Sequence, residues 1–189
     1  MTPPIAVALS RDLPHSTSIG TRVNGIEYVV WRDASGVAHI WDDRCPHRGM
    51  KMSLGFVRGD AIACLYHGWE YATDGQCRKI PAHPDLDVPK TIRIGTHPVA
   101  ERSGKIWLGF DDVPQWPTHQ ETNPVRSLYV AAPVRTTDLK TLPDGASAAL
   151  QPVSDGETML HICVRDPKLT EAAYRWGLRL RSTLERQTQ

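Results

Sequence analysis

Short runs of β-branched and aromatic residues, separated by glycine-bearing turns, dominate residues 20–110. The segment 26–43, IEYVVWRDASGVAHIWDD, holds two such runs around the loop 33–36, and this pattern predicts a β-hairpin. Further turn signals separate the later strand-like runs and lie at Gly59-Asp60, Asp74-Gly75 and Arg102-Ser103-Gly104. Turns at this density favour antiparallel connections, so we expect a mainly β domain of the small sandwich or barrel class.

The hydrophobic pattern changes after residue 110. The stretch 111–125, DDVPQWPTHQETNPV, has three prolines and no sustained period, which places a domain boundary near residue 112. Beyond it, RSLYVAAPV and TMLHICVRD read as strands, with turn signals at Asp144-Gly145 and Asp155-Gly156. We expect an N-terminal segment, a β domain, a linker and a short α+β tail, at residues 1–19, 20–112, 113–127 and 128–189.

The end of the chain predicts an amphipathic helix. Asp166 can cap it, and Pro167 suits its first position. Apolar residues recur at spacings of three and four, at Leu169, Ala173, Trp176, Leu180 and Leu184. The pair of Glu171 and Arg175 contributes only about 0.2–0.5 kcal/mol, so burial of the apolar face must supply most of the stability. We expect this face to pack on a sheet of the same chain rather than on a partner helix.

The composition excludes several kinds of partner. The 189 residues suit one domain of ordinary size, or one compact domain with an appendage. With 22 Lys and Arg against 21 Asp and Glu, the net charge of +1 offers no field for holding nucleic acid or an anionic bilayer. The sequence shows neither a signal-peptide pattern nor about 18 consecutive apolar residues. We therefore expect a cytoplasmic protein with no nucleic acid and no membrane among its partners.

Two short motifs bring cysteine and histidine together. Cys45 and His47 lie in C-P-H-R-G; after the sixteen residues 48–63, Cys64 and His67 lie in C-L-Y-H-G-W. Two thiolates and two imidazoles suit either a tetrahedral zinc ion or an iron–sulfur cluster. Structural zinc sites usually pair cysteines on one turn and histidines on another, whereas each motif here supplies one of each. This mixed arrangement favours a two-iron cluster that is clamped from both sides.

The combined pattern resembles the Rieske [2Fe-2S] proteins. The resemblance implies that Cys45 and Cys64 ligate one iron of a [2Fe-2S] cluster, while His47 and His67 ligate the other, nearer solvent. The wider stretch 20–112 is similar to the N-terminal domain of Rieske non-haem iron oxygenases of the ring-hydroxylating and O-demethylating kind. That family implies a small antiparallel sandwich or barrel with a cluster-binding subdomain, followed here by an α+β appendage that ends in the amphipathic helix.

Residues beside the ligands have expected roles of their own. Gly49 and Gly68 let the backbone approach the cluster, because a Cβ atom would obstruct it. Pro46 stiffens the first motif between its two ligands. Trp69 either shields the cluster or packs in the core.

The remaining cysteines indicate no disulfide. Rieske proteins of respiratory cytochrome bc complexes carry a disulfide across the cluster, at positions that correspond to Met50 and Tyr66 here. We therefore expect no such bond, and a reduction potential toward the low end of roughly −150 to +300 mV. Cys77 and Cys163 have no histidine nearby in the sequence and are expected to be small packed residues.

A complete oxygenase is not expected from this sequence. Those enzymes hold a catalytic iron on two histidines and a carboxylate, within an N-x-x-D-x-x-H-x4-H run, and the sequence contains no such run. A scattered site of His119, His161 and a carboxylate such as Glu121 or Asp166 is a weaker alternative. The chain is then an oxidoreductase component with no catalytic residues of its own.

The function that we expect is electron transfer. An NAD(P)H-dependent reductase or ferredoxin would supply single electrons, and a terminal oxygenase or catalytic subunit would receive them. One alternative is a shortened oxygenase subunit whose mononuclear iron lies on another chain, for which the tail 113–189 would serve assembly, including assembly of a homo-oligomer. A redox sensor is the least favoured alternative, because no output domain is evident.

Overall fold

The computed structural model describes residues 3–109 and 117–188, and the chain divides into two compact units. The loop unit comprises Leu13–Thr21 and Glu27–Val99. The helix unit comprises Met1–Asp12, Arg22–Ile26 and Ala100–Gln189. The boundary predicted near residue 112 lies outside the described residues.

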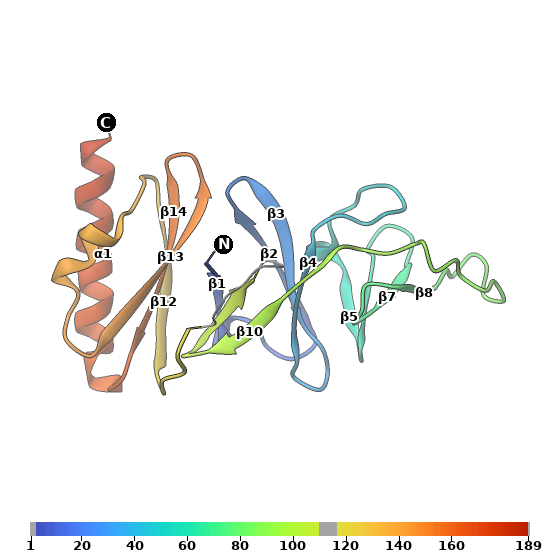
Figure 1. Cartoon of the computed structure of the whole chain (residues 1–189), viewed down its shortest axis with the longest axis horizontal. Helices are drawn as coiled ribbons and strands as arrows, with labels where there is room; N and C mark the ends of the chain where they lie inside the picture. The colour runs from blue at the N-terminus through green and yellow to red at the C-terminus, as the bar shows by residue number, and fades with distance from the viewer. Residues whose placement is uncertain (1–2, 110–116, 189) are drawn as a thin grey trace. The chain divides into compact units, whose positions relative to one another are not determined.

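Two four-stranded sheets build the loop unit, with the strand orders β2-β3-β4-β9 and β5-β6-β7-β8 (Figure 1). The strands are β2 (Thr17–Val23), β3 (Ile26–Arg32), β4 (Ala38–Asp42), β5 (Phe56–Arg58), β6 (Ala61–Ala63), β7 (Glu70–Ala72), β8 (Cys77–Lys79) and β9 (Thr96–His97), with the 3-10 turn η2 (Met52–Leu54). Strands β3 and β4 pair antiparallel, with Trp31 opposite His39. The predicted hairpin and the mainly β, antiparallel fold class are confirmed.

Large aromatic side chains fill the core of the loop unit. Trp31 and Trp41 are buried and meet edge to face, with ring centroids 4.9 Å apart. Cys45, Cys64 and Cys77 belong to the same buried cluster. Burial of this surface stabilises the unit, and the cysteines of both motifs pack in the same core.

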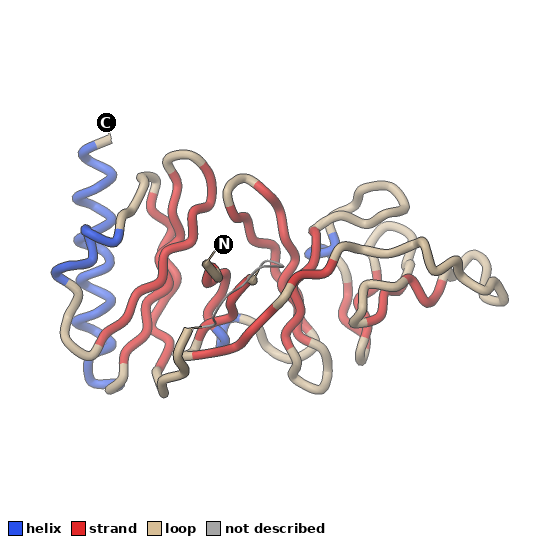
Figure 2. The backbone as a smooth tube through the Cα atoms, viewed as in Figure 1, coloured by secondary structure: helices blue, strands red, loops and turns tan. Residues whose placement is uncertain are grey.

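Two three-stranded sheets and one α-helix build the helix unit. The sheet orders are β1-β11-β10 and β12-β14-β13. The elements are β1 (Ile5–Leu9), η1 (Ser10–Asp12), β10 (Val99–Arg102), β11 (Lys105–Leu108), β12 (Asn123–Val130), η3 (Thr136–Thr141), β13 (Ala146–Ser154), β14 (Glu157–Val164), η4 (Pro167–Leu169) and α1 (Thr170–Gln187). Helix α1 lies along one face of the β12-β14-β13 sheet, as Figure 2 shows.

Strand β13 has little strand propensity of its own. Its residues, ASAALQPVS, include few β-branched side chains and one proline, Pro152. The strand is at the edge of its sheet, where a residue without an N–H group is tolerated. Pairing with β14 therefore decides its conformation, and local propensity does not.

The predicted C-terminal helix is confirmed, with a short 3-10 entry. The Asp166 carboxylate accepts the N–H of Lys168 at 2.9 Å, and the α-helix follows from Thr170. Ala173 and Trp176 are buried in one apolar cluster with residues of β12 and β14, so the apolar face packs on a sheet of this chain. Among the described residues, no helix is long and apolar enough to cross a membrane.

Gly177 sets how closely α1 approaches its sheet. A Cβ atom at this position would lie 2.6 Å from a methyl carbon of Ile162 and 2.7 Å from one of Leu128. Glycine is unfavourable inside a helix by about 1 kcal/mol relative to alanine, so close packing outweighs the helix propensity here.

Candidate metal centre

The first motif forms a tight loop that is closed by its own backbone. The N–H of Cys45 donates to the carbonyl of Met50 at 2.8 Å, and the N–H of Gly49 donates to the carbonyl of Cys45 at 2.8 Å. Gly49 has a φ of 74°, in the left-handed region that non-glycine residues rarely adopt. The loop thus needs a glycine four residues after its cysteine.

The second motif repeats this loop at the same spacing. The N–H of Cys64 donates to the carbonyl of Trp69, and the N–H of Gly68 donates to the carbonyl of Cys64, both at 2.9 Å. Gly68 has a φ of 68°. The two glycines were predicted for close approach to a cluster; the structure adds a conformational reason that holds without any cofactor.

Neighbouring elements fix both loops at their bases. The second loop connects β6 to β7, and Ala63 pairs with Glu70 where it leaves the sheet. The first loop follows β4, and the buried Asp43 carboxylate accepts the N–H and the hydroxyl of Ser53 on η2, both at 2.7 Å. Sequence reasoning missed this brace between Asp43 and Ser53, because nothing local marks a residue ten positions away as a partner.

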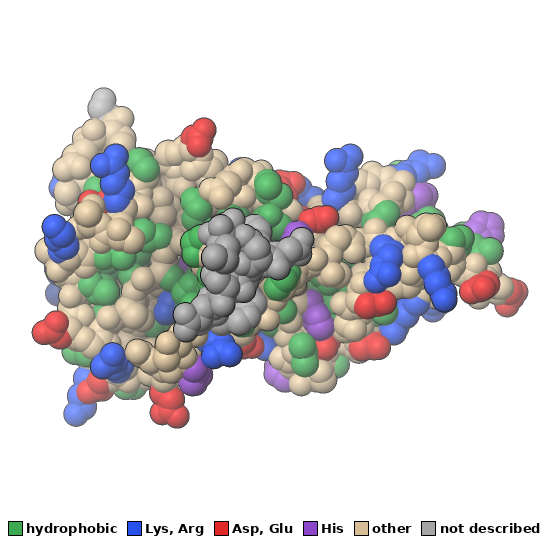
Figure 3. Space-filling view, viewed as in Figure 1, with side chains coloured by type: hydrophobic (Ala, Val, Ile, Leu, Met, Phe, Trp, Pro, Cys, Tyr) green, Lys and Arg blue, Asp and Glu red, His purple; other side chains and the backbone are tan. Residues whose placement is uncertain are grey.

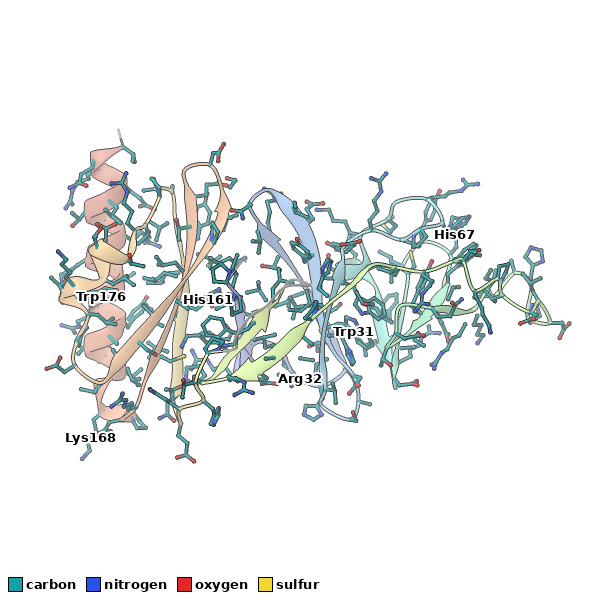
Figure 4. All side chains as sticks on the ribbon, in the orientation of Figure 1. Trp31, Arg32, His67, His161, Lys168 and Trp176 are labelled. Carbon is teal, nitrogen blue, oxygen red and sulfur yellow. The ribbon has the colours of Figure 1, made fainter. Side chains whose placement is uncertain are left out.

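The four predicted ligands come together, with sulfur inside and nitrogen outside. Cys45 and Cys64 are 2% and 3% exposed. His67 is exposed and His47 is half-buried, and their ring centroids lie 4.6 Å apart. Figure 4 shows His67 on a loop beyond the strands of its unit. Any group held here would have a buried thiol side and a solvent-facing imidazole side.

Opposing effects act on the pKa of the thiol in the second loop. Burial raises the pKa of Cys64, and the neighbouring Cys45 raises it further, while the N–H groups of Tyr66 and His67 donate toward its sulfur and oppose that rise. Two buried thiolates side by side therefore need a cation, as metal binding supplies. The amide donors are already in place for a negatively charged sulfur.

The surroundings of the imidazole on the first loop favour its neutral form. Partial burial lowers the pKa of His47, and electrostatic interactions with the neighbouring His67 and Arg48 lower it further. A neutral imidazole is the form that binds a metal ion.

Tyr71 contributes a polar contact that sequence reasoning missed. Its hydroxyl lies 3.2 Å from the Cys45 sulfur and is fully buried. Burial and then Cys45 raise the pKa of Tyr71, so the hydroxyl keeps its proton and is the donor once the sulfur is a thiolate. Hydrogen bonds to ligand sulfurs raise the potential of iron–sulfur clusters, which acts against the low potential expected from the sequence.

Each imidazole also has an aromatic neighbour. Trp69 stacks on His47 with centroids 4.2 Å apart, and Tyr66 contacts His67 at 3.9 Å. Trp69 packs against the core of the loop unit as well. The two roles considered for Trp69, shielding the site and packing in the core, are thus combined in one side chain.

These residues fit a [2Fe-2S] cluster. The two buried sulfurs would hold one iron and the two outward nitrogens the other, so that each iron would have one like pair of ligands. Across residues 3–109 and 117–188, no three His, Cys, Asp or Glu side chains are grouped as a single metal ion would need. A cluster of two irons does not need three ligands around one point, because each iron takes only two protein ligands. All four cysteines of the sequence are free and buried, so no disulfide crosses the loops.

The alternative iron site is not assembled in this chain. His161 is buried in the β12-β14-β13 sheet, whereas His119 and Glu121 line a surface cavity of about 400 Å³. Asp166 caps the turn before α1. The structure thus places His119 and Glu121 at one cavity, while His161 lies inside the sheet and Asp166 caps a turn, so the four do not form one site.

Comparison with known proteins matches the loop-bearing part of the chain. The model of the family described as Rieske [2Fe-2S] domain matches residues 4–94. Oxidoreductase NdmD of Pseudomonas putida is 39% identical over 112 residues, which cover 59% of this chain and 19% of that protein. The 4beta-methylsterol monooxygenase of Methylococcus capsulatus is 43% identical over 88 residues, covering 44% of this chain and 23% of that protein. The chain spans about a fifth of the length of the curated relatives that it matches.

Solved structures share the fold over most of this chain. Apo dicamba monooxygenase superposes with a TM-score of 0.77 at 16% identity, covering 96% of this chain and 84% of that one. NdmA of Pseudomonas putida gives a TM-score of 0.73 at 17% identity, covering 97% and 80%. At this identity, the likeness concerns the fold alone.

Proposed function

The chain contains a Rieske [2Fe-2S] domain, and we propose that it passes single electrons from a reductase to a non-haem iron oxygenase. When bound, the cluster accepts and releases one electron at a time. Cys45 and Cys64 hold one iron in this proposal, and His47 and His67 hold the other. The electron enters and leaves on the imidazole side, because that side faces solvent.

The pair of matching loops is the observation that best supports electron transfer. Each loop presents one thiol inward and one imidazole outward, and the ring centroids of His47 and His67 are 4.6 Å apart. Electron transfer needs only a held redox group and an exposed edge, which this arrangement supplies.

Metal analysis of the anaerobically purified chain tests the proposal. We expect two irons and two acid-labile sulfides per chain, with a paramagnetic signal after dithionite reduction. His67→Ala should lose iron, while His67→Cys should keep a cluster with an altered spectrum, because a thiolate can replace the imidazole. His83→Ala, which removes an exposed histidine elsewhere in the loop unit, should change neither. An unaltered iron content in His67→Ala would overturn the ligand assignment.

A second candidate is a shortened oxygenase subunit whose mononuclear iron lies on another chain. The fold likeness to dicamba monooxygenase covers 96% of this chain, so it extends beyond the cluster loops into the β12-β14-β13 sheet and α1. Oxygen uptake with a reductase and candidate aromatic acids separates the two functions. A carrier consumes no oxygen without an added oxygenase, whereas a subunit does so once its partner chain supplies a third iron.

A further inference from the structure

Five neighbouring side chains form an exposed surface around the two loops, here called the loop patch: Arg44, Arg48, Leu65, Tyr66 and His67. Leu65 and Tyr66 are 47% and 54% exposed, and the Tyr66 ring lies against His67 with centroids 3.9 Å apart. Single exposed apolar residues are ordinary. Here, however, two adjacent ones lie on the loop that carries a proposed ligand, and the Tyr66 ring contacts that ligand at the place where a redox partner must come close.

The two arginines of the loop patch are not used by the fold. The Arg44 side chain passes over the first loop, since a Cβ atom at Gly49 would lie 3.2 Å from its Nε. Neither Arg44 nor Arg48 has a carboxylate partner within residues 3–109 and 117–188, whereas nearby Lys51 pairs with Glu27 at 2.6 Å. Figure 3 shows Lys and Arg side chains projecting from this edge of the loop unit. Unpaired cations beside an apolar centre are typical of the rim of a protein interface.

The chemistry of the cluster restricts what can dock there. Nicotinamide cofactors deliver hydride, a pair of electrons, but the cluster accepts one electron. The group that donates directly to the cluster must therefore release one electron at a time, as the iron–sulfur cluster of a carrier protein does, and no atom is transferred. Positive rim charges attract a negatively charged partner and raise its association rate.

Acidic residues near the loops would orient a partner that docks on the loop patch. Gly68 faces Pro81, because a Cβ atom added to Gly68 would lie 3.2 Å from the Pro81 ring. The segment that begins at Pro81 carries Asp85 and Asp87, both exposed. A partner that is drawn to the arginines and repelled by these carboxylates would dock in one orientation.

We propose that the loop patch is the docking surface for an acidic one-electron carrier of the ferredoxin type, an inference that rests on the function proposed above. One electron leaves the reduced carrier, which is thereby oxidised, and the cluster bound between the loops is reduced by it. Arg44 and Arg48 draw the carrier in, while Leu65 and Tyr66 form the water-poor contact at its centre.

Stopped-flow reduction of the cluster-loaded full chain tests this proposal, with a reduced acidic plant-type ferredoxin as the probe. Its potential, about −400 mV, lies below the Rieske range, so transfer is downhill. We expect a second-order rate constant that falls steeply as salt increases. Arg44→Glu and Arg48→Glu should each slow the reaction about tenfold or more at low salt. Arg179→Glu makes the same change of charge on α1 and should leave the rate nearly unchanged.

Two further measurements separate failure of the docking surface from failure of the function. Leu65→Ser should slow transfer while leaving its salt dependence in place, because it removes an exposed apolar side chain and no charge. Iron content and dithionite reduction of every variant should equal those of the parent chain. If the cluster is intact and Arg48→Glu behaves like Arg179→Glu, the docking proposal is wrong while electron transfer stands. If the parent chain itself binds no cluster, the proposed function fails.

Discussion

The indole of Trp69 stacks face to face on the imidazole of His47, with centroids 4.2 Å apart and planes only 4° from parallel. Trp69 ends the second loop, and His47 lies in the first, so this contact bridges the two motifs. Because Trp69 also packs against the core, the orientation of a proposed iron ligand is tied to the hydrophobic interior.

Trp69→Ala should loosen this ligand without removing it. A stacked aromatic pair contributes about 0.5–1.5 kcal/mol beyond its buried area, so iron release to a chelator should be faster by roughly fivefold. Broadening of the paramagnetic signal of the reduced cluster should accompany it. Trp69→Phe should restore most of both properties, and equal effects of Phe and Ala would contradict a stacking role.

Tyr71→Phe should lower the reduction potential. The Tyr71 hydroxyl lies 3.2 Å from the Cys45 sulfur, and donation to a ligand sulfur stabilises the more negative, reduced state. Loss of a bond worth about 1 kcal/mol between the redox states corresponds to about 40 mV for one electron. Redox titration followed by absorbance measures it. Tyr28→Phe, a change of the same kind at a tyrosine on β3, should leave the potential within about 10 mV; a Tyr71→Phe potential equal to the parent's would show that the hydroxyl does not tune the site.

Asp33 should make the loop unit sensitive to acid. Burial alone would raise the pKa of Asp33, but hydrogen bonds from His39, Ser35 and the N–H of Val37 lower it to about 2. The stabilisation is therefore complete above the unfolded pKa near 4 and is lost as the pH falls toward 2. Its size is about 2 kcal/mol.

Asp33→Asn tests this in urea unfolding at pH 7, followed by tryptophan fluorescence. The free energy of unfolding should fall by about 1–2 kcal/mol, and its dependence on pH between 4 and 2 should flatten. Asp85→Asn, at an exposed carboxylate on a loop, should remain within about 0.5 kcal/mol of the parent. Similar losses in both variants would contradict a special role for Asp33.

His161 should make the helix unit less stable below neutral pH. Its Nε2 lies 2.8 Å from Gln151 Oε1, and its Nδ1 lies 2.9 Å from the Ser127 hydroxyl. Gln151 donates its amide to the carbonyl of Arg22, so its oxygen faces His161 and selects the tautomer protonated on Nε2. Burial, aided by the charge of Lys105, lowers the pKa of His161 to about 4.

Because the unfolded chain binds this proton more tightly, stability is complete above the unfolded pKa near 6.5 and declines as the pH falls toward 4. Between pH 7.5 and 5, the free energy of unfolding should drop by about 2 kcal/mol, read from circular dichroism of α1. His161→Gln should lose that dependence, and His83→Gln should keep it. A ring resonance of His161 that titrates near pH 6.5 would show that the buried neutral state is wrong.

The sequence determined the local parts of this protein. Each loop is closed by bonds between residues four and five positions apart, and the predicted site rests on cysteine, histidine and glycine at that fixed local spacing. The hairpin at 33–36 and the capped C-terminal helix were predictable for the same reason, since turn and cap residues act on their near neighbours.

Tertiary structure decided what lies around that site. Tyr71 meets Cys45 from 26 residues away, Trp69 reaches His47 on the other loop, and β13 exists as a strand only because β14 pairs with it. These contacts depend on sheet register and on which core side chains fill the space between strands. The sequence alone does not define that register, because the same alternation of apolar and polar residues is compatible with many strand pairings. Packing of the side chains selects one of them.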